Sequence, residues 1–160
     1  MKKKIVLAGI LAVLVLIQFI RIDKTKPEAP ASLDYFSVTN PPEEIEDILR
    51  NACFDCHSNE TVYPWYADVA PVSWLIKHHV NEGREDLNFS EWGSYSSSRA
   101  EEINKECFEE VLDHEMPLKS YTLMHPKAKL SPEQRSQLQQ WFISQKKNKN
   151  TGPEPYEISV

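Results

Sequence analysis

Apolar side chains recur at helical spacing in four segments after residue 40, and no convincing run alternates with the period of two typical of a strand. The first segment has an apolar stripe at i, i+3, i+4 and i+7, formed by Ile45, Ile48, Leu49 and Ala52. Glu43 and Glu44 favour a helix N-terminus there, because acidic groups complement the helix dipole. The stripe predicts a helix that leads directly to residue 53.

Three further segments have the same pattern. Pro71 begins the second, which we expect to end at Gly83. The third starts with a capping-box pattern at Ser98 and stops before Pro117, because the residue before a proline is pushed out of the α region. Ser131 is placed to cap the last helix. The stripes are Val72, Leu75, Ile76 and His79; Ala100, Ile103, Cys107, Phe108, Val111 and Leu112; and Leu138, Trp141 and Phe142. We therefore expect an all-α domain with long loops, one of them an irregular aromatic loop over 88–98.

The N-terminal residues have a different pattern. Lys2, Lys3 and Lys4 precede an apolar run over 5–20, which is broken only by Gln18. A basic start followed by a hydrophobic core is typical of a secretory signal or a signal anchor. Since no small-residue cleavage site follows closely, the run predicts an uncleaved transmembrane helix within residues 1–21. The positive-inside rule then predicts a single-pass protein of the cytoplasmic membrane with its C-terminal domain on the periplasmic side.

Composition divides the rest of the chain. Residues 22–40 are rich in proline and charge and predict a linker, 41–145 form the helical domain, and 146–160 are expected to be a flexible tail. The whole chain has a net charge of −6. Residues 1–21 contain four basic and no acidic side chains, so 14 basic and 24 acidic residues remain, a net of −10. This charge argues against binding of nucleic acid.

Cys53, Cys56 and His57 form a Cys-x-x-Cys-His motif at the end of the first predicted helix. This is the spacing that attaches one haem c covalently, because each thiol can add to a vinyl group and the adjacent imidazole then lies beneath the iron. The motif predicts Cys53, Cys56 and His57 as cofactor-binding residues and His57 as the proximal iron ligand. We expect a backbone carbonyl near Pro64, or alternatively that of Pro71, to accept a hydrogen bond from the other ring nitrogen of His57.

Two other uses of the cysteines are weaker. Zinc needs four ligands and hence a second ligand pair, whereas Cys107 stands alone. A thioredoxin-like dithiol follows a strand, whereas a predicted helix precedes Cys53. The helical stripe that contains Cys107 favours a buried core thiol at that position.

The order of these parts resembles a class I cytochrome c. More closely, the chain is similar to the membrane-anchored haem-binding domain family over nearly its whole length. The segments that carry this resemblance are 63–66 (Tyr-Pro-Trp-Tyr), 88–95, 115–118 (Glu-Met-Pro-Leu), Tyr121 and 125–126. The resemblance implies a small cytochrome c-like helical fold in which a methionine from a late loop is the distal iron ligand. Met116 holds that position, and His125 is the alternative.

These observations favour an electron carrier that exchanges single electrons with unidentified redox proteins on the outer face of the cytoplasmic membrane. The sequence contains no constellation of catalytic residues that would favour an enzyme. The alternative is a haem-based sensor or a peroxidase-like enzyme, in which the distal ligand is absent from the iron or is displaced by a small molecule.

Overall fold

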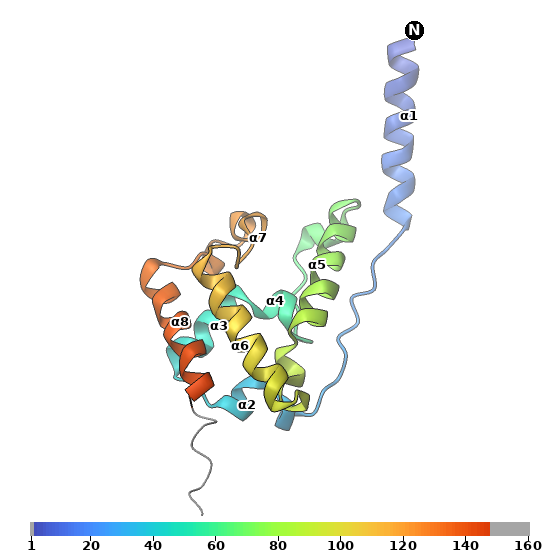
Figure 1. The fold of residues 1–160 in the computed structure, drawn as a ribbon. Coiled ribbons are helices and arrows are strands. Elements are labelled where there is room, and N and C mark those ends of the chain that lie inside the picture. Colours follow the sequence, from blue (N-terminus) through green and yellow to red (C-terminus); the bar gives the residue numbers. More distant parts are fainter. Residues whose placement is uncertain (1, 148–160) are drawn as a thin grey trace, which may run out of the picture.

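The computed structural model describes residues 2–147, and these residues form helices and connecting loops without a strand (Figure 1). The α-helices are α1 (Lys2–Leu16), α2 (Tyr35–Thr39), α3 (Glu43–Ala52), α4 (Phe54–His57), α5 (Val72–Asp86), α6 (Ser97–Leu112), α7 (Lys119–Met124) and α8 (Pro132–Lys147). Short 3-10 helices are η1 (Ile17–Phe19), η2 (Ala31–Leu33), η3 (Trp65–Asp68), η4 (Phe89–Ser94) and η5 (Pro126–Ala128). The expected all-α architecture is confirmed. Most of the tail expected over 146–160 lies outside the described residues.

The core lies where α3, α6 and α8 meet, and α6 runs along α8 (Figure 1). Leu49 of α3, Ile103 of α6 and Leu138 of α8 are almost completely buried there. They belong to the apolar stripes seen in the sequence, because each helix buries one face against the others. Phe142 of α8 completes the contact.

A second part of the core comes from residues that the sequence placed in the 22–40 linker. Tyr35 of α2 is completely buried, and its ring centroid lies 4.9 Å from that of Phe89 and 4.8 Å from that of Trp92. The indole Nε1 of Trp141 donates a hydrogen bond of 2.9 Å to the Tyr35 hydroxyl. Asp34 caps α2 by accepting from the backbone N–H of Phe36. Residues 31–39 are therefore packed on the helical domain. The sequence did not predict this packing, because the segment is short and only one of its aromatic rings, that of Tyr35, is fully buried.

The prediction of a transmembrane helix within residues 1–21 is wrong. Within residues 2–147, no helix combines the length and the apolar character needed to cross a membrane. Helix α1 has 15 residues, which corresponds to about 22 Å against a hydrocarbon core of about 30 Å, and it includes Lys2, Lys3 and Lys4. After α1 the chain tightens into η1 and leaves helical geometry at Ile20. The apolar run is thus longer than the helix that it forms.

The end of this run is attached to the domain. The Gln18 side-chain amide donates to the Ala70 carbonyl and accepts from the Ala70 N–H, each at 3.0 Å. The indole of Trp74 donates to the Ile20 carbonyl at 3.1 Å. Gln18, which interrupts the apolar run in the sequence, therefore connects the N-terminal segment to the loop before α5.

Two other local expectations differ from the structure. The capping residue of α6 is Ser96 and not Ser98, since the Ser96 hydroxyl accepts from the N–H of Arg99 at 3.2 Å. The 88–98 region, expected to be irregular, contains η4, which begins where the Asn88 side chain accepts from the N–H of Ser90. Serine and asparagine both favour the N-cap position of a helix, so the residue type alone did not distinguish Ser96 from Ser98.

Candidate functional site

The motif of residues 53–57 lies on a break between two helices. Helix α3 ends at Ala52, and Cys53 departs from helical geometry with φ −125°. The chain then forms α4, in which the N–H groups of Cys56 and His57 donate to the Cys53 carbonyl at 3.2 and 3.0 Å. The three motif side chains are therefore arranged by a tight turn at Cys53 and not by one continuous helix.

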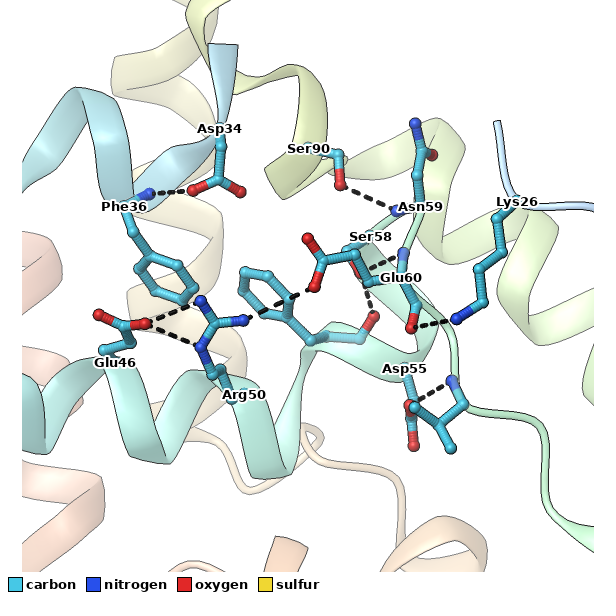
Figure 2. A network of polar contacts seen from close by, with 12 residues as sticks. Lys26, Asp34, Phe36, Glu46, Arg50, Asp55, Ser58, Asn59, Glu60 and Ser90 are labelled. Atoms are coloured by element: carbon cyan, nitrogen blue, oxygen red, sulfur yellow. Dashed lines mark hydrogen bonds and ion pairs between the residues drawn. The ribbon is translucent and has the colours of Figure 1, made fainter. Parts of the chain in front are cut away.

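Several hydrogen bonds fix the loop that follows the motif. The Ser58 hydroxyl donates to the Phe54 carbonyl at 2.8 Å. It also accepts from the N–H of Glu60 at 2.9 Å, as Figure 2 shows. The Arg50 guanidinium pairs with Glu46 at 2.8 Å and lies 4.5 Å above the Phe36 ring. Arg50 also lies 5.4 Å from the Phe54 ring, which stacks on the Phe36 ring with 4.8 Å between centroids, so these contacts hold α4 against α2 and α3.

The His57 imidazole is oriented by the backbone of α5. Its Nδ1 lies 2.7 Å from the carbonyl oxygen of Gly83 and 3.3 Å from that of Leu87. Burial lowers the pKa of His57, although the two carbonyls oppose this effect. A neutral ring that donates from Nδ1 keeps a lone pair on Nε2, which is the nitrogen available to a metal. The carbonyl near Pro64, expected from the sequence, is not the acceptor.

Gly83 does not end α5 as the sequence suggested, because the helix continues to Asp86. A Cβ at this position would lie 2.9 Å from the carbonyl oxygen of Cys56. The glycine therefore allows α5 to approach α4 closely enough for its carbonyl to reach the His57 ring. The sequence analysis did not predict this role. The one feature that could have indicated it is the position of Gly83 on the apolar stripe of the helix.

Both motif thiols are free and partly buried. Burial raises the pKa of Cys53 to about 12 and that of Cys56 to about 11, so both are protonated at neutral pH. A redox-active dithiol has a low thiol pKa, and this site has the opposite character. Within residues 2–147, no cluster of three or more His, Cys, Asp or Glu side chains is arranged to hold a metal ion.

A cavity of about 240 Å³ brings the predicted site residues together. Its lining includes Cys53, Cys56, His57 and Met116. A second cavity of about 360 Å³, with mostly apolar walls, adjoins it and is formed by α5, α7 and the loop before η3. The residues common to both cavities are Cys56, His79, Leu118 and Tyr121. The two thiols and the imidazole thus line the first cavity together, and Cys56 also lines the mainly apolar one.

The two candidate distal ligands lie in different cavities. Met116 shares its cavity with His57, and its backbone is held by Glu110, whose carbonyl accepts at 3.2 Å, and by Arg135, which donates to its carbonyl at 3.1 Å. His125 lines the apolar cavity, which His57 does not reach. The His125 ring also stacks on Tyr121 with 4.1 Å between centroids. Of the two residues, only Met116 therefore lines a cavity together with His57.

His79 lies at the junction of the two cavities, one turn before Gly83 on α5. Its position on an apolar stripe suggested a core histidine, whereas the structure leaves it half-buried on the cavity wall.

Asp55, inside the motif, was also missed by sequence reasoning. The Tyr121 hydroxyl donates to one carboxylate oxygen of Asp55 at 2.7 Å, and the N–H of Val62 donates to the other at 2.9 Å. Burial and the bond to Asp55 raise the pKa of Tyr121. Asp55 therefore connects α4 with α7 and with the loop after the motif, across the mouth of the apolar cavity.

Comparison with known proteins gives one match. A family model described as a haem-binding domain matches residues 12–144. No curated protein and no solved structure matches the chain. The donor set is consistent with the family, because an imidazole with a free Nε2 and two thiols adjoin an apolar space suited to a porphyrin.

Proposed function

Because this chain belongs to the haem-binding domain family, we propose that it is a c-type cytochrome domain that carries single electrons between redox proteins. The haem supplies one-electron chemistry when bound. The protein's task is then to hold the cofactor, to fix both axial ligands and to limit access of water to the iron.

The first part of the proposal is that Cys53 and Cys56 attach one haem covalently and that His57 is the proximal ligand. The support is the orientation of His57, whose Nδ1 is engaged by the Gly83 carbonyl at 2.7 Å while its ring adjoins the cavity that both thiols line. A histidine fixed in this way is held in the tautomer that binds metal through Nε2. This is the observation that carries the proposed function.

The second part is that Met116 is the distal ligand. Met116 and His57 line the same cavity, and the backbone of Met116 is anchored by α6 and α8. If His57 and Met116 both held the haem iron, little rearrangement of the protein would accompany electron transfer. A thioether ligand also raises the reduction potential.

The third part concerns location. The basic start and apolar run at residues 2–20 resemble an export signal, and covalent haem attachment is completed outside the cytoplasm in bacteria. We therefore place the haem-bearing domain on the outer side of the cytoplasmic membrane, where its electron donors and acceptors are also expected.

Optical spectra of the holoprotein test this function. The expected result is a low-spin spectrum in both oxidation states, a weak near-infrared band from a sulfur ligand, and slow or negligible binding of carbon monoxide. Rapid and complete binding of carbon monoxide by the ferrous protein would instead identify an open sixth site and favour a sensor or a peroxidase-like enzyme.

The attachment is tested on a denaturing gel stained for haem. The wild-type chain and Cys107→Ser should keep the haem, whereas Cys53→Ala and Cys56→Ala should have weakened attachment. Cys107 is the matched control because it is also a partly buried thiol with a pKa raised by burial, but it lies outside the motif. Loss of all haem from the denatured wild type would rule out covalent attachment.

A further inference from the structure

The mouth of the apolar cavity is an exposed apolar surface. We define the cavity rim as Val62, Trp65, Leu75 and Met124, which line the apolar cavity and yet remain exposed. Trp65 is 76% exposed and Val62 70%. Leu123, beside Met124 on α7, is 79% exposed. Large apolar side chains grouped at a cavity mouth are typical of an interaction site.

The rim is connected to the motif by a series of aromatic rings. Tyr121 adjoins Cys56 in both cavities, and its ring stacks on His125. A ring nitrogen of His125 lies 3.3 Å from the Tyr66 hydroxyl, and the Tyr66 ring packs edge-on against Trp65 with 5.7 Å between centroids. Continuous contacts therefore lead from the motif to an exposed tryptophan.

Charge is distributed unevenly around this surface. The segment 117–130, which contains α7 and η5, has three lysines and no acidic residue, although the whole chain has a net charge of −6. The lysines are Lys119, Lys127 and Lys129. All three are exposed, and none forms an ion pair within residues 2–147. The α7–η5 segment, which follows the cavity-lining residue Leu118 and includes Tyr121 and Met124 of the cavity wall, is thus locally basic.

We propose that the cavity rim and the basic α7–η5 segment together form the docking surface for an acidic redox protein. This inference rests on the proposed electron-transfer function and names the kind of partner. Carboxylates of the partner face the three lysines and steer the encounter, whereas apolar contact with Trp65 and Leu123 brings its redox centre close to the aromatic series.

Whether the rate of electron transfer rises or falls with ionic strength tests the charge of the α7–η5 segment. The ferrous holoprotein is mixed with hexacyanoferrate(III), an anion that accepts one electron from the haem, at increasing ionic strength. The net charge of −6 predicts repulsion and a rate that rises with salt, whereas docking at the lysines predicts attraction and a rate that falls with salt. We expect the rate to fall.

A pair of charge reversals controls for net charge. Lys127→Glu should slow the reaction several-fold at low ionic strength. Lys105→Glu makes the same change in net charge on α6, where Lys105 pairs with Glu109, and should leave the rate nearly unchanged. If the two variants slowed the reaction equally, the effect would come from net charge alone, and the proposed docking at the α7–η5 lysines would be wrong.

A protein probe tests the apolar part. A reduced plant-type ferredoxin, a small acidic iron–sulfur protein, donates one electron to the ferric domain. Leu123→Ser should slow this reaction several-fold and leave the reaction with hexacyanoferrate unchanged, because a small ion does not need the apolar contact. Ile143→Ser, which removes an exposed apolar side chain from α8, is the control and should slow neither.

The outcomes separate this inference from the function on which it rests. If the haem exchanges electrons with neither probe, electron transfer itself is wrong. If it reacts with both but Lys127→Glu and Leu123→Ser behave like their controls, the function stands and the docking surface is wrong. Self-association, or binding to phosphatidylserine vesicles, that is abolished by Lys127→Glu while reaction with ferredoxin is unchanged would also overturn the proposed occupant.

Discussion

At the scale of single residues, the close contact of Gly83 with the Cys56 backbone predicts the effect of adding a side chain at this position. Gly83→Ala should destabilise the domain by roughly 1–3 kcal/mol, because the new methyl group would meet the Cys56 backbone at 2.9 Å. Separation of α5 from α4 should also weaken the bond from His57 to the Gly83 carbonyl and shift the haem spectrum. Denaturant unfolding and optical spectra measure the two effects.

Gly9→Ala is the matched control. Gly9 also lies within a helix, but no heavy atom outside its own turn lies within 4 Å of an added Cβ. That change should be neutral or stabilise α1 by up to about 1 kcal/mol through helix propensity. A Gly83→Ala variant as stable as Gly9→Ala would contradict the close approach of α5 to α4.

The second prediction for a single residue concerns Met116, the proposed distal ligand of the iron. Met116→Ala should abolish the near-infrared band, open the iron to carbon monoxide and lower the reduction potential, because the thioether ligand is lost. Met124→Ala is the control, since Met124 lines only the apolar cavity and is partly exposed. If Met116→Ala retains the wild-type spectrum while His79→Ala gives high-spin iron, the ligand is His79, which also adjoins the His57 cavity.

At the scale of elements, the hydrogen bond from Tyr121 to Asp55 connects α7 to the motif helix α4. Tyr121→Phe removes the donor to Asp55 and should destabilise the domain by about 1–3 kcal/mol, because a partly buried carboxylate loses a partner. Amide hydrogen exchange should increase over Lys119–Met124 more than over α6. Equal exchange in α7 of the wild type and the variant would show that other contacts hold this helix.

At the scale of the whole molecule, residues 31–39 are predicted to be part of the folded domain. Tyr35→Ala should cost about 3–5 kcal/mol, since it removes a fully buried ring that contacts Phe89, Trp92 and Trp141. Val38→Ala, at a half-exposed site on the same helix, should cost far less. Thermal unfolding of both variants decides whether this segment is a linker or a structural element.

The sequence alone determined the helical class and the positions of the main helices, because each buries one face and therefore repeats apolar residues at helical spacing. It also predicted a haem cofactor, since two thiols and an imidazole at fixed spacing in five consecutive residues need no tertiary information to be recognised. The family match over residues 12–144 confirms the haem-binding family, whereas covalent attachment through Cys53 and Cys56 is part of our proposal.

Only the tertiary structure decided how distant residues meet. The acceptor for His57 is a backbone carbonyl 26 positions away, and backbone atoms leave almost no trace in a sequence. The separation of Met116 from His125 likewise depends on how the loops fold over α4 and α5. The N-terminal run had the composition of a membrane span, but hydropathy does not determine where a helix ends. The turn at Ile17–Phe19 and the bonds of Gln18 to Ala70 decided that end.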